Sequence, residues 1–580
     1  MSARPGFADV ALAARDLAAR RFASAVARLH RGGGGDPGTR ATIESCAARC
    51  WRAAQEHGHS CVALDQDESA ALGASPAVAP AAAATAAEGS AERRDAVLVL
   101  ENGHLFLERL WRAEWRLAQS LLELAEPAPL ERAESIAAEM AALLGNADAD
   151  EAQQRAVTVA LSRRLTVISG GPGTGKTTTL ARLIALYARL VPQARIAIAA
   201  PTGKAAARVS EALHAQLAEL AAASGPASAR VPGATTLHRL LGVRGAGSRP
   251  SFGRERPLPF DLVVVDEASM VDLELASALV TALGAHARLV LSGDRDQLAS
   301  VEAGAVFAAL CAARDERVRG SVVALERNYR QRETPEIVRW AQAARAGTMA
   351  AEDLAEGAGR VSLRRLAGAV AADQAALGRT ALAGYAPALE LLGREGGSAA
   401  VAAELLGHLA GYRVLCALRQ GPFGVEALNR VVAAAARMAV GADPDAAWYP
   451  GRFVIVNRNT PELGLFNGDT GVCLRRGGTL AVAFPAAAGL HWVAVAQMPA
   501  CADAFALTVH QAQGSEFDQV TLVPAPAGHR LATRELIYTG ITRARSKLEI
   551  FAGEGALSDA AGRVTERTGL LGWRLAGGAA

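Results

Sequence analysis

The sequence predicts an α/β fold in which helices alternate with the strands of a parallel sheet from about residue 146 onward. Short, apolar, β-branched runs recur between stretches of helical periodicity, which is the pattern of βαβ units. Polar motifs follow several of these runs directly, and ligands bind at the carboxyl ends of strands in a parallel sheet. The candidate strands are residues 165–169, 196–199, 262–265, 289–291 and 322–325.

Length and composition indicate a globular protein of several domains. Its 580 residues suggest roughly four domains of about 150 residues. No stretch approaches the ~18 uncharged apolar residues of a spanning helix, and charges scattered through the first thirty residues argue against a signal peptide. We therefore expect a soluble, cytoplasmic protein. The net charge of +3 neither requires nor excludes nucleic acid, because a local groove can be basic on a balanced protein.

Residues 1–145 carry no catalytic signature. Residues 1–70 are expected to form short helices broken by a glycine loop, and the Ala/Pro/Ser/Gly-rich residues 73–91 to form a flexible linker. The Asn102-Gly103 pair between two apolar runs predicts a β-hairpin, which a helix follows. A group of cysteines and histidines lacks the paired spacing of a zinc site, so packing is favoured over metal binding for Cys46, Cys50, His57, His59 and Cys61.

A glycine-rich turn after the first candidate strand has the spacing G-x-x-x-x-G-K-T. Glycines let backbone N–H groups curl around an anion without Cβ clashes, and the N-terminus of the following helix adds partial positive charge. The lysine of such a loop reaches the β- and γ-phosphates, and the threonine hydroxyl can bind Mg²⁺. A nucleotide is therefore expected to contact Gly170, Gly171, Pro172, Gly173, Thr174, Gly175, Lys176, Thr177 and Thr178.

Two adjacent carboxylates, Asp266 and Glu267, follow the candidate strand at residues 262–265. Charges at the end of a buried strand are costly unless they meet a cation. Asp266 is suited to bind Mg²⁺ directly or through water, and Glu267 to orient and activate an attacking water. The alternative is an exposed Asp-Glu pair without a role, and the position at a strand end after a phosphate loop argues against it.

Four further side chains complete the expected nucleotide site, although each alone is weak evidence. Gln153 offers an amide suited to an adenine edge. Gln297 follows the strand at residues 289–291 and can bond the γ-phosphate or the lytic water, but a simple polar turn explains it equally well. Arg330 and Arg543 carry guanidinium groups that suit the charge spread over a transferring phosphoryl group.

Taken in order, these segments resemble the motifs of superfamily 1 DNA helicases over about residues 150–555. Residues 200–206, 235–238 and 508–517 are similar to further motifs of that family. The resemblance implies ATP and Mg²⁺ as cofactors, with Thr177 and Asp266 as metal ligands and Glu516 on the ribose or γ-phosphate side. Its implied catalytic residues are Lys176, Asp266, Glu267, Gln297, Arg330 and Arg543.

The same resemblance implies a DNA path and a domain plan. DNA would cross two RecA-like lobes, held mainly by phosphate contacts, with ATP in the cleft between the lobes. The lobes are expected at residues 146–350 and at residues 351–429 with 501–580. A β-rich subdomain is expected at residues 430–500, and a mainly helical, partner-docking domain at residues 1–145. The implied DNA contacts are Pro201, Thr202, Lys204, Thr236, His238, Thr508 and His510.

A narrower likeness is to the RecD family, the α subunits of exodeoxyribonuclease V. Residues 169–179, 415–424, 463–469 and 508–517 resemble that family. The likeness implies an ATP-driven 5′→3′ motor on single-stranded DNA that works beside RecB and RecC in double-strand-break repair and homologous recombination, with the nuclease in a partner subunit. One departure is Gln511, where the family usually has a lysine, so that a phosphate contact would be weaker.

Other functions stay open on the sequence alone. A stand-alone 5′→3′ helicase of the same motor class is one, although relatives of that type usually carry a longer N-terminal extension with helix-hairpin-helix elements. A catalytically inactive scaffold is another, and the complete set of motifs argues against it. A GTPase is disfavoured because the chain lacks an Asn-Lys-x-Asp segment. The arginine-bearing loop at residues 244–259 is expected to be solvated rather than bound to DNA.

Overall fold

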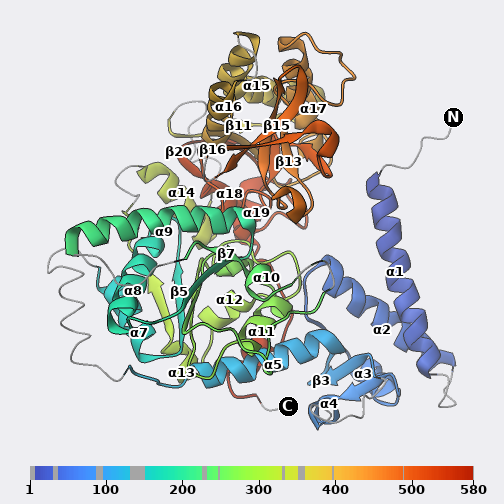
Figure 1. The fold of residues 1–580 in the computed structure, drawn as a ribbon. Helices are drawn as coiled ribbons and strands as arrows, with labels where there is room; N and C mark the ends of the chain where they lie inside the picture. The colour runs from blue at the N-terminus through green and yellow to red at the C-terminus, as the bar shows by residue number, and fades with distance from the viewer. Residues whose placement is uncertain are drawn as a thin grey trace.

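The structure is a computed structural model in which the chain forms an N-terminal domain, two α/β lobes and a β subdomain (Figure 1). The second lobe and the β subdomain lie above the first lobe in this view, and the N-terminal domain lies beside and below it. Arg330 and the glycine loop after residue 30 fall outside the described part of the chain. The structure describes residues 7–30, 37–86, 96–130, 150–224, 232–243, 245, 248–329, 334–349, 359–394, 398–486 and 489–578.

The N-terminal domain opens with two long helices, and α1 stands away from the rest of the molecule while packing on α2 (Figure 1). The expectation of short helices is wrong, because α1 has 24 residues and α2 has 20. A small sheet with the order β1-β4-β3-β2 follows. The elements are α1 (Phe7–His30), α2 (Pro37–Glu56), β1 (Cys61–Ala63), α3 (Gln66–Gly73), β2 (Val78–Pro80), α4 (Ala81–Ala86), β3 (Leu98–Glu101), β4 (His104–Leu107) and α5 (Glu108–Leu124).

The predicted hairpin is confirmed, but the predicted linker is wrong within residues 78–86. Asn102 and Gly103 adopt φ angles of 48° and 69°, which a tight turn between β3 and β4 requires. Strand β2 pairs in parallel with β3, and its Val78 and Ala79 are buried. Because a strand partner and an apolar core are available, the alanine-rich composition does not keep this segment unstructured. Residues 87–91 of the expected linker lie outside the described residues.

The first lobe is a parallel sheet with the order β10-β5-β9-β8-β6-β7, and it confirms all five candidate strands. Helices α7, α8 and α9 pack on one face, while α11, α12 and α5 pack on the other. The elements are α7 (Glu151–Ser162), β5 (Leu165–Gly170), α8 (Lys176–Leu190), β6 (Ile196–Ala200), α9 (Gly203–Ser224), β7 (Thr235–Thr236), α10 (Leu237–Leu240), β8 (Leu262–Val265), η2 (Ala268–Met270), α11 (Leu273–Thr281), β9 (Arg288–Gly293), α12 (Val306–Cys311), α13 (Glu316–Arg319), β10 (Val322–Leu325) and α14 (Pro335–Ala346).

The second lobe repeats this architecture with a parallel sheet of the order β11-β20-β19-β12-β18. Helix α14 packs on α18, so the chain that leaves the first lobe joins the core of the second. The elements are β11 (Val361–Arg365), α15 (Val370–Arg394), α16 (Ala399–Gly411), β12 (Tyr412–Cys416), α17 (Val425–Ala439), β18 (Ala506–Thr508), β19 (Phe517–Val523), α18 (Arg534–Ile541), β20 (Ala544–Ala552), α19 (Ala556–Gly562) and α20 (Leu571–Leu575).

The β subdomain is inserted between α17 and β18 of the second lobe. It is an antiparallel sheet with the order β16-β15-β14-β13-β17. The structure thus has the fold class that the resemblance implied: two RecA-like lobes, an inserted β subdomain and a mainly helical N-terminal domain. The elements are β13 (Phe453–Val456), η5 (Pro461–Leu463), β14 (Thr470–Arg476), β15 (Thr479–Ala486), β16 (Gly489–Ala494), η6 (Val495–Gln497) and β17 (Cys501–Asp503).

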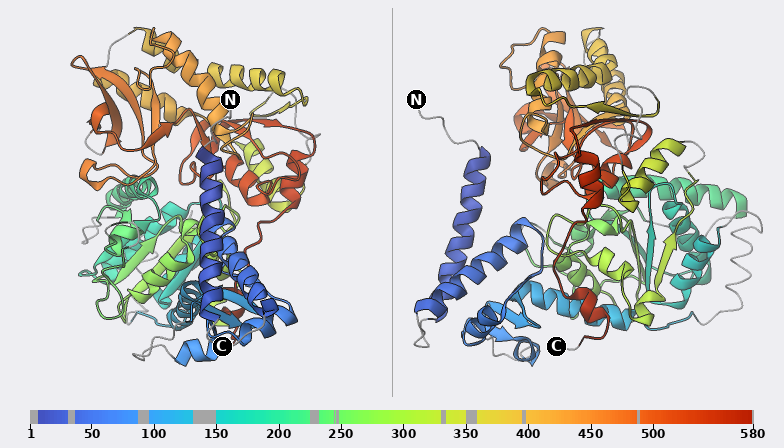
Figure 2. Two further views of the ribbon diagram at one scale, coloured as in Figure 1. Left: turned by 90° about the vertical axis from the view of Figure 1, so that its right-hand side faces the viewer. Right: turned by 180° about the vertical axis from the view of Figure 1, so that it is seen from behind.

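The C-terminal segment fastens the N-terminal domain to the motor lobes. After α19 the chain runs back along the first lobe to α20, which packs on α5 (Figure 2). On the way, Arg567 donates hydrogen bonds to the carbonyls of Ser300 and Glu302. In α20, the buried Arg574 forms ion pairs with Glu101 and Glu114 of the N-terminal domain. This buried network therefore joins the two ends of the chain.

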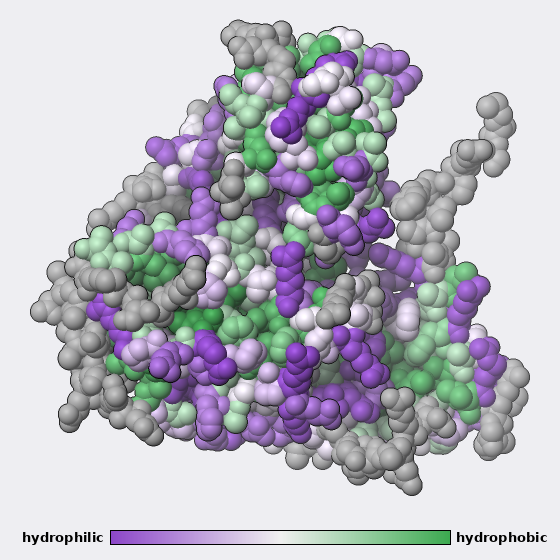
Figure 3. All heavy atoms as spheres, viewed as in Figure 1, coloured by the Kyte–Doolittle hydropathy of each residue, from purple (hydrophilic) through white to green (hydrophobic). Residues whose placement is uncertain are grey.

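Neither a metal cluster nor a membrane-spanning helix occurs in the described ranges. No group of three or more His, Cys, Asp or Glu side chains could hold a metal ion there, and Cys46, Cys50 and Cys61 are buried. None of the described helices is long and apolar enough to cross a bilayer. Hydrophilic side chains are spread over both lobes and the N-terminal domain on the face shown in Figure 3.

We predict that Arg574→Met loosens α5. Removing one partner of a buried ion pair leaves the carboxylates of Glu101 and Glu114 uncompensated, at a cost of about 3 kcal/mol. The opening free energy of α5, measured by hydrogen exchange, should fall by that amount. The control Arg364→Met breaks a partly exposed pair with Glu549 and should change it by less than about 0.5 kcal/mol. Equal protection in both variants would contradict the proposed fastening.

Candidate active site

A cavity of about 520 Å³ lies between the two lobes and collects most of the side chains that the sequence singled out. The first lobe contributes the turn after β5, the start of α8 and the turn after β8. The second lobe contributes the segment between β18 and β19 and the residue before β20. Its predicted lining residues are Gln153, Gly171, Pro172, Gly173, Thr174, Gly175, Lys176, Thr177, Thr178, Asp266, Glu267, Gln297, Glu516 and Arg543.

The loop after β5 is shaped by glycines and opens α8. Gly173 and Gly175 have φ angles of 79° and 81°, and a Cβ on Gly175 would lie 2.4 Å from Nε2 of Gln153. Lys176 Nζ donates to the carbonyls of Gly170 at 2.6 Å and Gly171 at 3.1 Å, which places Gly170 directly behind the cavity wall. The amides at the start of α8 thus border a pocket for an anion, as at other helix N-termini.

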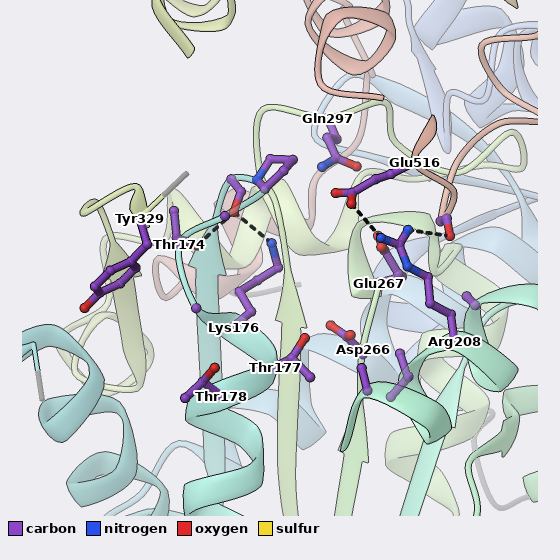
Figure 4. Close-up of a pocket in the computed structure, with 18 of the residues that line it drawn as sticks. Thr174, Lys176, Thr177, Thr178, Arg208, Asp266, Glu267, Gln297, Tyr329 and Glu516 are labelled. Atoms are coloured by element: carbon purple, nitrogen blue, oxygen red, sulfur yellow. Dashed lines mark hydrogen bonds and ion pairs between the residues drawn. The ribbon is translucent and has the colours of Figure 1, made fainter. Parts of the chain in front are cut away.

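Thr177 and Asp266 lie beside each other in the cavity (Figure 4). Asp266 is 6% exposed, and its Oδ1 accepts a hydrogen bond of 2.8 Å from Ser292 Oγ. One carboxylate oxygen is therefore held in place, while the second and the Thr177 hydroxyl remain for a ligand. A carboxylate and a hydroxyl are the oxygen ligands that Mg²⁺ takes in nucleotide sites, so the pair fits that ion.

Glu267 has the properties of a general base. Its φ of 52° is unusual for a residue other than glycine, and such strained backbone is common at functional sites. Burial raises the pKa of Glu267, and the charge of Asp266 raises it further, while the cations of Arg543 and Lys176 oppose the shift. A carboxylate whose pKa is raised toward neutrality is better matched to accept a proton from water.

The loop that carries Gln297 is bonded to the second lobe. Asp294 Oδ2 accepts hydrogen bonds from Gln297 Nε2 at 3.0 Å and from the Tyr538 hydroxyl at 2.9 Å. The backbone N–H of Leu298 donates to Thr539 Oγ1 at 3.0 Å. The carbonyl of Leu298 accepts from Gln513 Nε2 at 2.8 Å. Gln297 is thus held between the nucleotide cavity and two segments of the second lobe.

Arg543 is buried at 2% exposure and points a cation into the site from the second lobe. Its guanidinium donates to the carbonyls of Thr539 at 3.1 Å and Ser515 at 3.0 Å. Within the described ranges it forms no ion pair with a carboxylate. A buried guanidinium that is held by two carbonyls and the hydroxyl of Thr542 can supply its charge to an anion in the cavity.

Three polar side chains of the cavity were not predicted. Arg208 bonds Glu516 Oε2 at 2.7 Å and the carbonyl of Gly514 at 3.1 Å, so α9 of the first lobe reaches the second lobe (Figure 4). Arg208 follows Lys204 by one helical turn, and that spacing is a signal that could have pointed to it. The others have no local signal: Arg182 bonds Gln153 Oε1 at 2.7 Å, and Tyr329 lines the wall beside the glycine loop.

The predicted DNA contacts of the first lobe lie at one edge of its sheet. Pro201 and Thr202 follow β6, and Thr236 ends the neighbouring β7, where Ala200 pairs with Thr236. His238 lies in α10, which Thr236 caps by accepting a hydrogen bond from the backbone N–H of Arg239. These four residues therefore come together at the carboxyl ends of adjacent strands.

In the second lobe, Thr508 ends β18 and His510 lies in the turn that follows. Gln511 Oε1 accepts hydrogen bonds of 3.1 Å from both the backbone N–H and the hydroxyl of Thr508. The Gln511 side chain therefore folds back onto this turn, although the residue is exposed. Burial and the nearby Arg567 lower the pKa of His510, which favours a neutral imidazole at neutral pH.

Lys204 does not join the other predicted DNA contacts. Its ammonium lies 6.0 Å from the ring of Phe517 and lines a second cavity between the lobes. Burial and the charges of Arg413 and Arg208 lower the pKa of Lys204 to about 7. The arginine-bearing loop is exposed at Arg254 and Arg256, whereas Arg244 lies outside the described residues.

The chain was compared with protein-family models and with known proteins. A model of an AAA domain matches residues 153–303, and one of a UvrD-like helicase C-terminal domain matches residues 503–550. These ranges contain the phosphate loop with both carboxylates and the second-lobe segment with Glu516 and Arg543. A solved Pif1 helicase from Bacteroides bound to single-stranded DNA is 16% identical, with a TM-score of 0.39 over 70% of this chain and 92% of that one.

Several relatives carry the name RecBCD enzyme subunit RecD. The protein from Mycobacterium tuberculosis is 39% identical over 478 residues, which are 81% of this chain and 80% of the relative. The protein from Haemophilus influenzae is 31% identical over 72% of this chain and 71% of its own length. An ATP-dependent RecD2 DNA helicase from Deinococcus radiodurans is 31% identical over 80% of this chain but only 57% of its own length. The chain belongs to the RecD family of superfamily 1 DNA helicases.

Proposed function

We propose that this chain is the ATP-driven 5′→3′ motor subunit of an exodeoxyribonuclease V complex, working beside RecB and RecC subunits on DNA ends in the cytoplasm. The observation that carries the proposal is a single cavity that receives charged side chains from both lobes. Lys176, Asp266 and Glu267 enter from the first lobe, and Arg543 and Glu516 enter from the second. A ligand that bonds both sides can close the cleft, and its hydrolysis can release it.

The nucleotide is held mainly by the first lobe. The amides at the start of α8 and the ammonium of Lys176 bind the phosphates, after Lys176 exchanges its two loop carbonyls for phosphate oxygens. Gln153, oriented by Arg182, meets the adenine edge. Thr177 and Asp266 would hold Mg²⁺, which would supply positive charge to the phosphate oxygens.

Hydrolysis then uses charges from both lobes. Glu267 takes a proton from the water that attacks the γ-phosphorus, while the bond to the bridging oxygen breaks and ADP leaves. Lys176 and Arg543 stabilise the charge that spreads over the transferring group. Gln297 lies beside this group, and its loop is bonded to the second lobe, so loss of the γ-phosphate is transmitted to that lobe. Arg330 is kept as a candidate for the same charge-stabilising role.

DNA contacts are proposed at the edge formed by Pro201, Thr202, Thr236 and His238 in the first lobe and by Thr508 and His510 in the second. The first set follows β6 and β7, and the second set follows β18. Changing the distance between the two lobes changes the distance between the two contact sets, which is what stepping along a strand requires. Since Gln511 closes its own turn, phosphate binding there relies on Thr508 and His510.

The domain boundaries follow as part of the proposal, with residues 1–145 as the partner-docking domain. In support, α1 stands away from the body, and its Leu17 and Leu29 are 47% and 45% exposed. The alternatives are a stand-alone helicase of the same motor class and an inactive scaffold. Two relatives named as RecBCD subunits are 39% and 38% identical to this chain, against 31% for the RecD2 relative, which favours the subunit.

Strand displacement tests the proposed motor. The full chain, alone and with RecB and RecC, is given Mg²⁺-ATP and matched duplexes with a 5′ or a 3′ single-stranded tail. We expect unwinding of the 5′-tailed duplex only, and none with Lys176→Gln, because the charge clamp on the phosphates is lost. Unwinding without partners would favour the stand-alone alternative. Unwinding of only the 3′-tailed duplex would contradict the proposed 5′→3′ direction. If no mixture shows DNA-stimulated ATPase activity, the inactive scaffold would be the remaining alternative.

Replacing Arg543 tests its role across the cleft. Arg543→Ala should lower kcat for ATP about a thousandfold, because the guanidinium is needed mainly as charge develops in the transition state. The dissociation constant for a fluorescent ATP analogue should change by less than about tenfold, since the first lobe holds the phosphates. The exposed Arg530 supplies the control Arg530→Ala, which should leave both values unchanged. A parallel loss of binding and turnover would count against the role.

A further inference from the structure

A second cavity, of about 690 Å³, adjoins the nucleotide cavity. Its walls come from the start of α9 in the first lobe, from α16 and the starts of β12 and β19 in the second lobe, and from the β subdomain. The volume lies within the range of small-molecule sites. The apolar part of the wall is made by Leu406, Leu409, Ala410, Leu463, Leu465, Phe484, Pro485 and Phe517.

This cavity adjoins both sites described above, because Gly203 directly follows the proposed DNA contacts Pro201 and Thr202, but its set of lining residues differs from theirs. It lies at the amino ends of β12 and β19, whereas the proposed DNA contact Thr508 lies at the carboxyl end of the parallel β18. It borders the nucleotide cavity at the ion pair between Arg208 and Glu516, and both residues line both cavities. The two cavities therefore share one wall and have different sets of lining residues.

Two cations in the second cavity lack a carboxylate partner. Arg413 is 1% exposed; its terminal nitrogens donate to the carbonyls of Ala504 and Leu409, and its Nε has no acceptor among the described residues. Lys204 forms no ion pair in the described part of the chain, and the guanidinium of Arg413 lies 5.0 Å from the same Phe517 ring that Lys204 approaches. An unmatched buried cation is costly unless an anion compensates it.

The amino-acid composition also sets Lys204 apart, because lysine is rare in this chain. The chain contains 61 basic side chains, of which only Lys176, Lys204 and Lys547 are lysines. Lysine differs from arginine because it can lose its proton when it is buried. Lys176 faces the nucleotide, and Lys547 is exposed on β20. In a chain that otherwise uses arginine, a lysine at the wall of this cavity indicates a need for an amine rather than a guanidinium.

The electrostatic surroundings of Lys204 allow its charge to respond to a ligand. Burial lowers the pKa of Lys204 to about 7, and Arg413 from β12 and Arg208 from α9 add to this effect, while Asp469, at the start of β14, opposes it. The remaining charged or titratable groups on the wall are Glu211, His491, Glu516 and Arg545. An anion bound at the amine would raise this pKa, so binding would take up a proton and strengthen as pH falls toward about 7, with no further gain below it.

We propose that this cavity binds a small organic anion with an aromatic or apolar body. The anionic group lies between Arg413 and Lys204, and the body packs on the leucine and phenylalanine side chains of the α16 and β-subdomain walls. Three parts of the molecule supply these walls, so an occupant would tie them together. We expect a bound anion to slow ATP turnover without competing with ATP. This consequence rests on the proposed motor function, whereas the binding of the anion does not.

Labelling with pyridoxal 5′-phosphate tests the site. This probe joins a phosphate to an aromatic aldehyde: the neutral lysine amine attacks the aldehyde carbon, water leaves, and borohydride then reduces the imine to a stable amine. The full chain is labelled at pH 8 with saturating Mg²⁺-ADP on the phosphate loop, and the three lysines are compared by peptide mass spectrometry. We expect Lys204 to be labelled about tenfold faster than Lys547 by the phosphate probe, and this preference to be weaker with pyridoxal, which lacks the anionic group.

A charge at the cavity mouth provides matched variants. Ala207 is exposed on α9 and lines the cavity, whereas Ala218 is exposed farther along the same helix and lines neither cavity. Ala207→Glu should slow labelling of Lys204 by the phosphate probe about tenfold but not labelling by pyridoxal, and Ala218→Glu should change neither. Equal labelling of Lys204 and Lys547, equal rates with both probes, or equal behaviour of both variants would each overturn the proposal. None of these readouts needs DNA or ATP hydrolysis, so their failure is separate from failure of the motor.

Discussion

The hydrogen bonds between the loop at residues 294–298 and the second lobe are the interaction on which the active site depends. The Asp294 carboxylate accepts a hydrogen bond from the Tyr538 hydroxyl. The backbone N–H of Leu298 donates to Thr539, and its carbonyl accepts from Gln513. In the proposed mechanism neither lobe alone supplies the charges for phosphoryl transfer, because the phosphate loop and Arg543 lie on opposite sides of the cavity. A loop bonded to both sides sets their separation, and Gln297 stands on that loop.

The same logic extends outward through the molecule. After Gln297, the carbonyls of Ser300 and Glu302 accept hydrogen bonds from Arg567. The same C-terminal segment carries Arg574, which forms buried ion pairs with the N-terminal domain. A partner bound to the N-terminal domain would therefore contact a domain that the C-terminal segment connects to the loop bearing Gln297. This offers a physical route by which a complex could bias the motor, through packed elements with fixed contacts.

Sequence predicted those parts of the molecule that depend on local spacing. The five strands of the first sheet, the glycine loop and the carboxylate pair follow from patterns within a few residues, and the structure places them together. Arg208 and Tyr538 reach the site from elements far apart in the sequence, so no local pattern could show their partners. The linker predicted for the alanine-rich segment was wrong for a related reason. Strand β2 forms because it pairs with β3, and composition carries no information about such a partner.

The most direct test of the link between the lobes is a double-mutant cycle on kcat for ATP with Tyr538→Phe and Asp294→Asn. If the hydroxyl–carboxylate bond aligns the site, each change should lower kcat several-fold at unchanged affinity for ATP, and the pair together should lower it little further, a coupling of about 1 kcal/mol or more. Full multiplication of the two effects would show that the residues act separately. In that case the bonds of residues 294–298 would not set the geometry of the site.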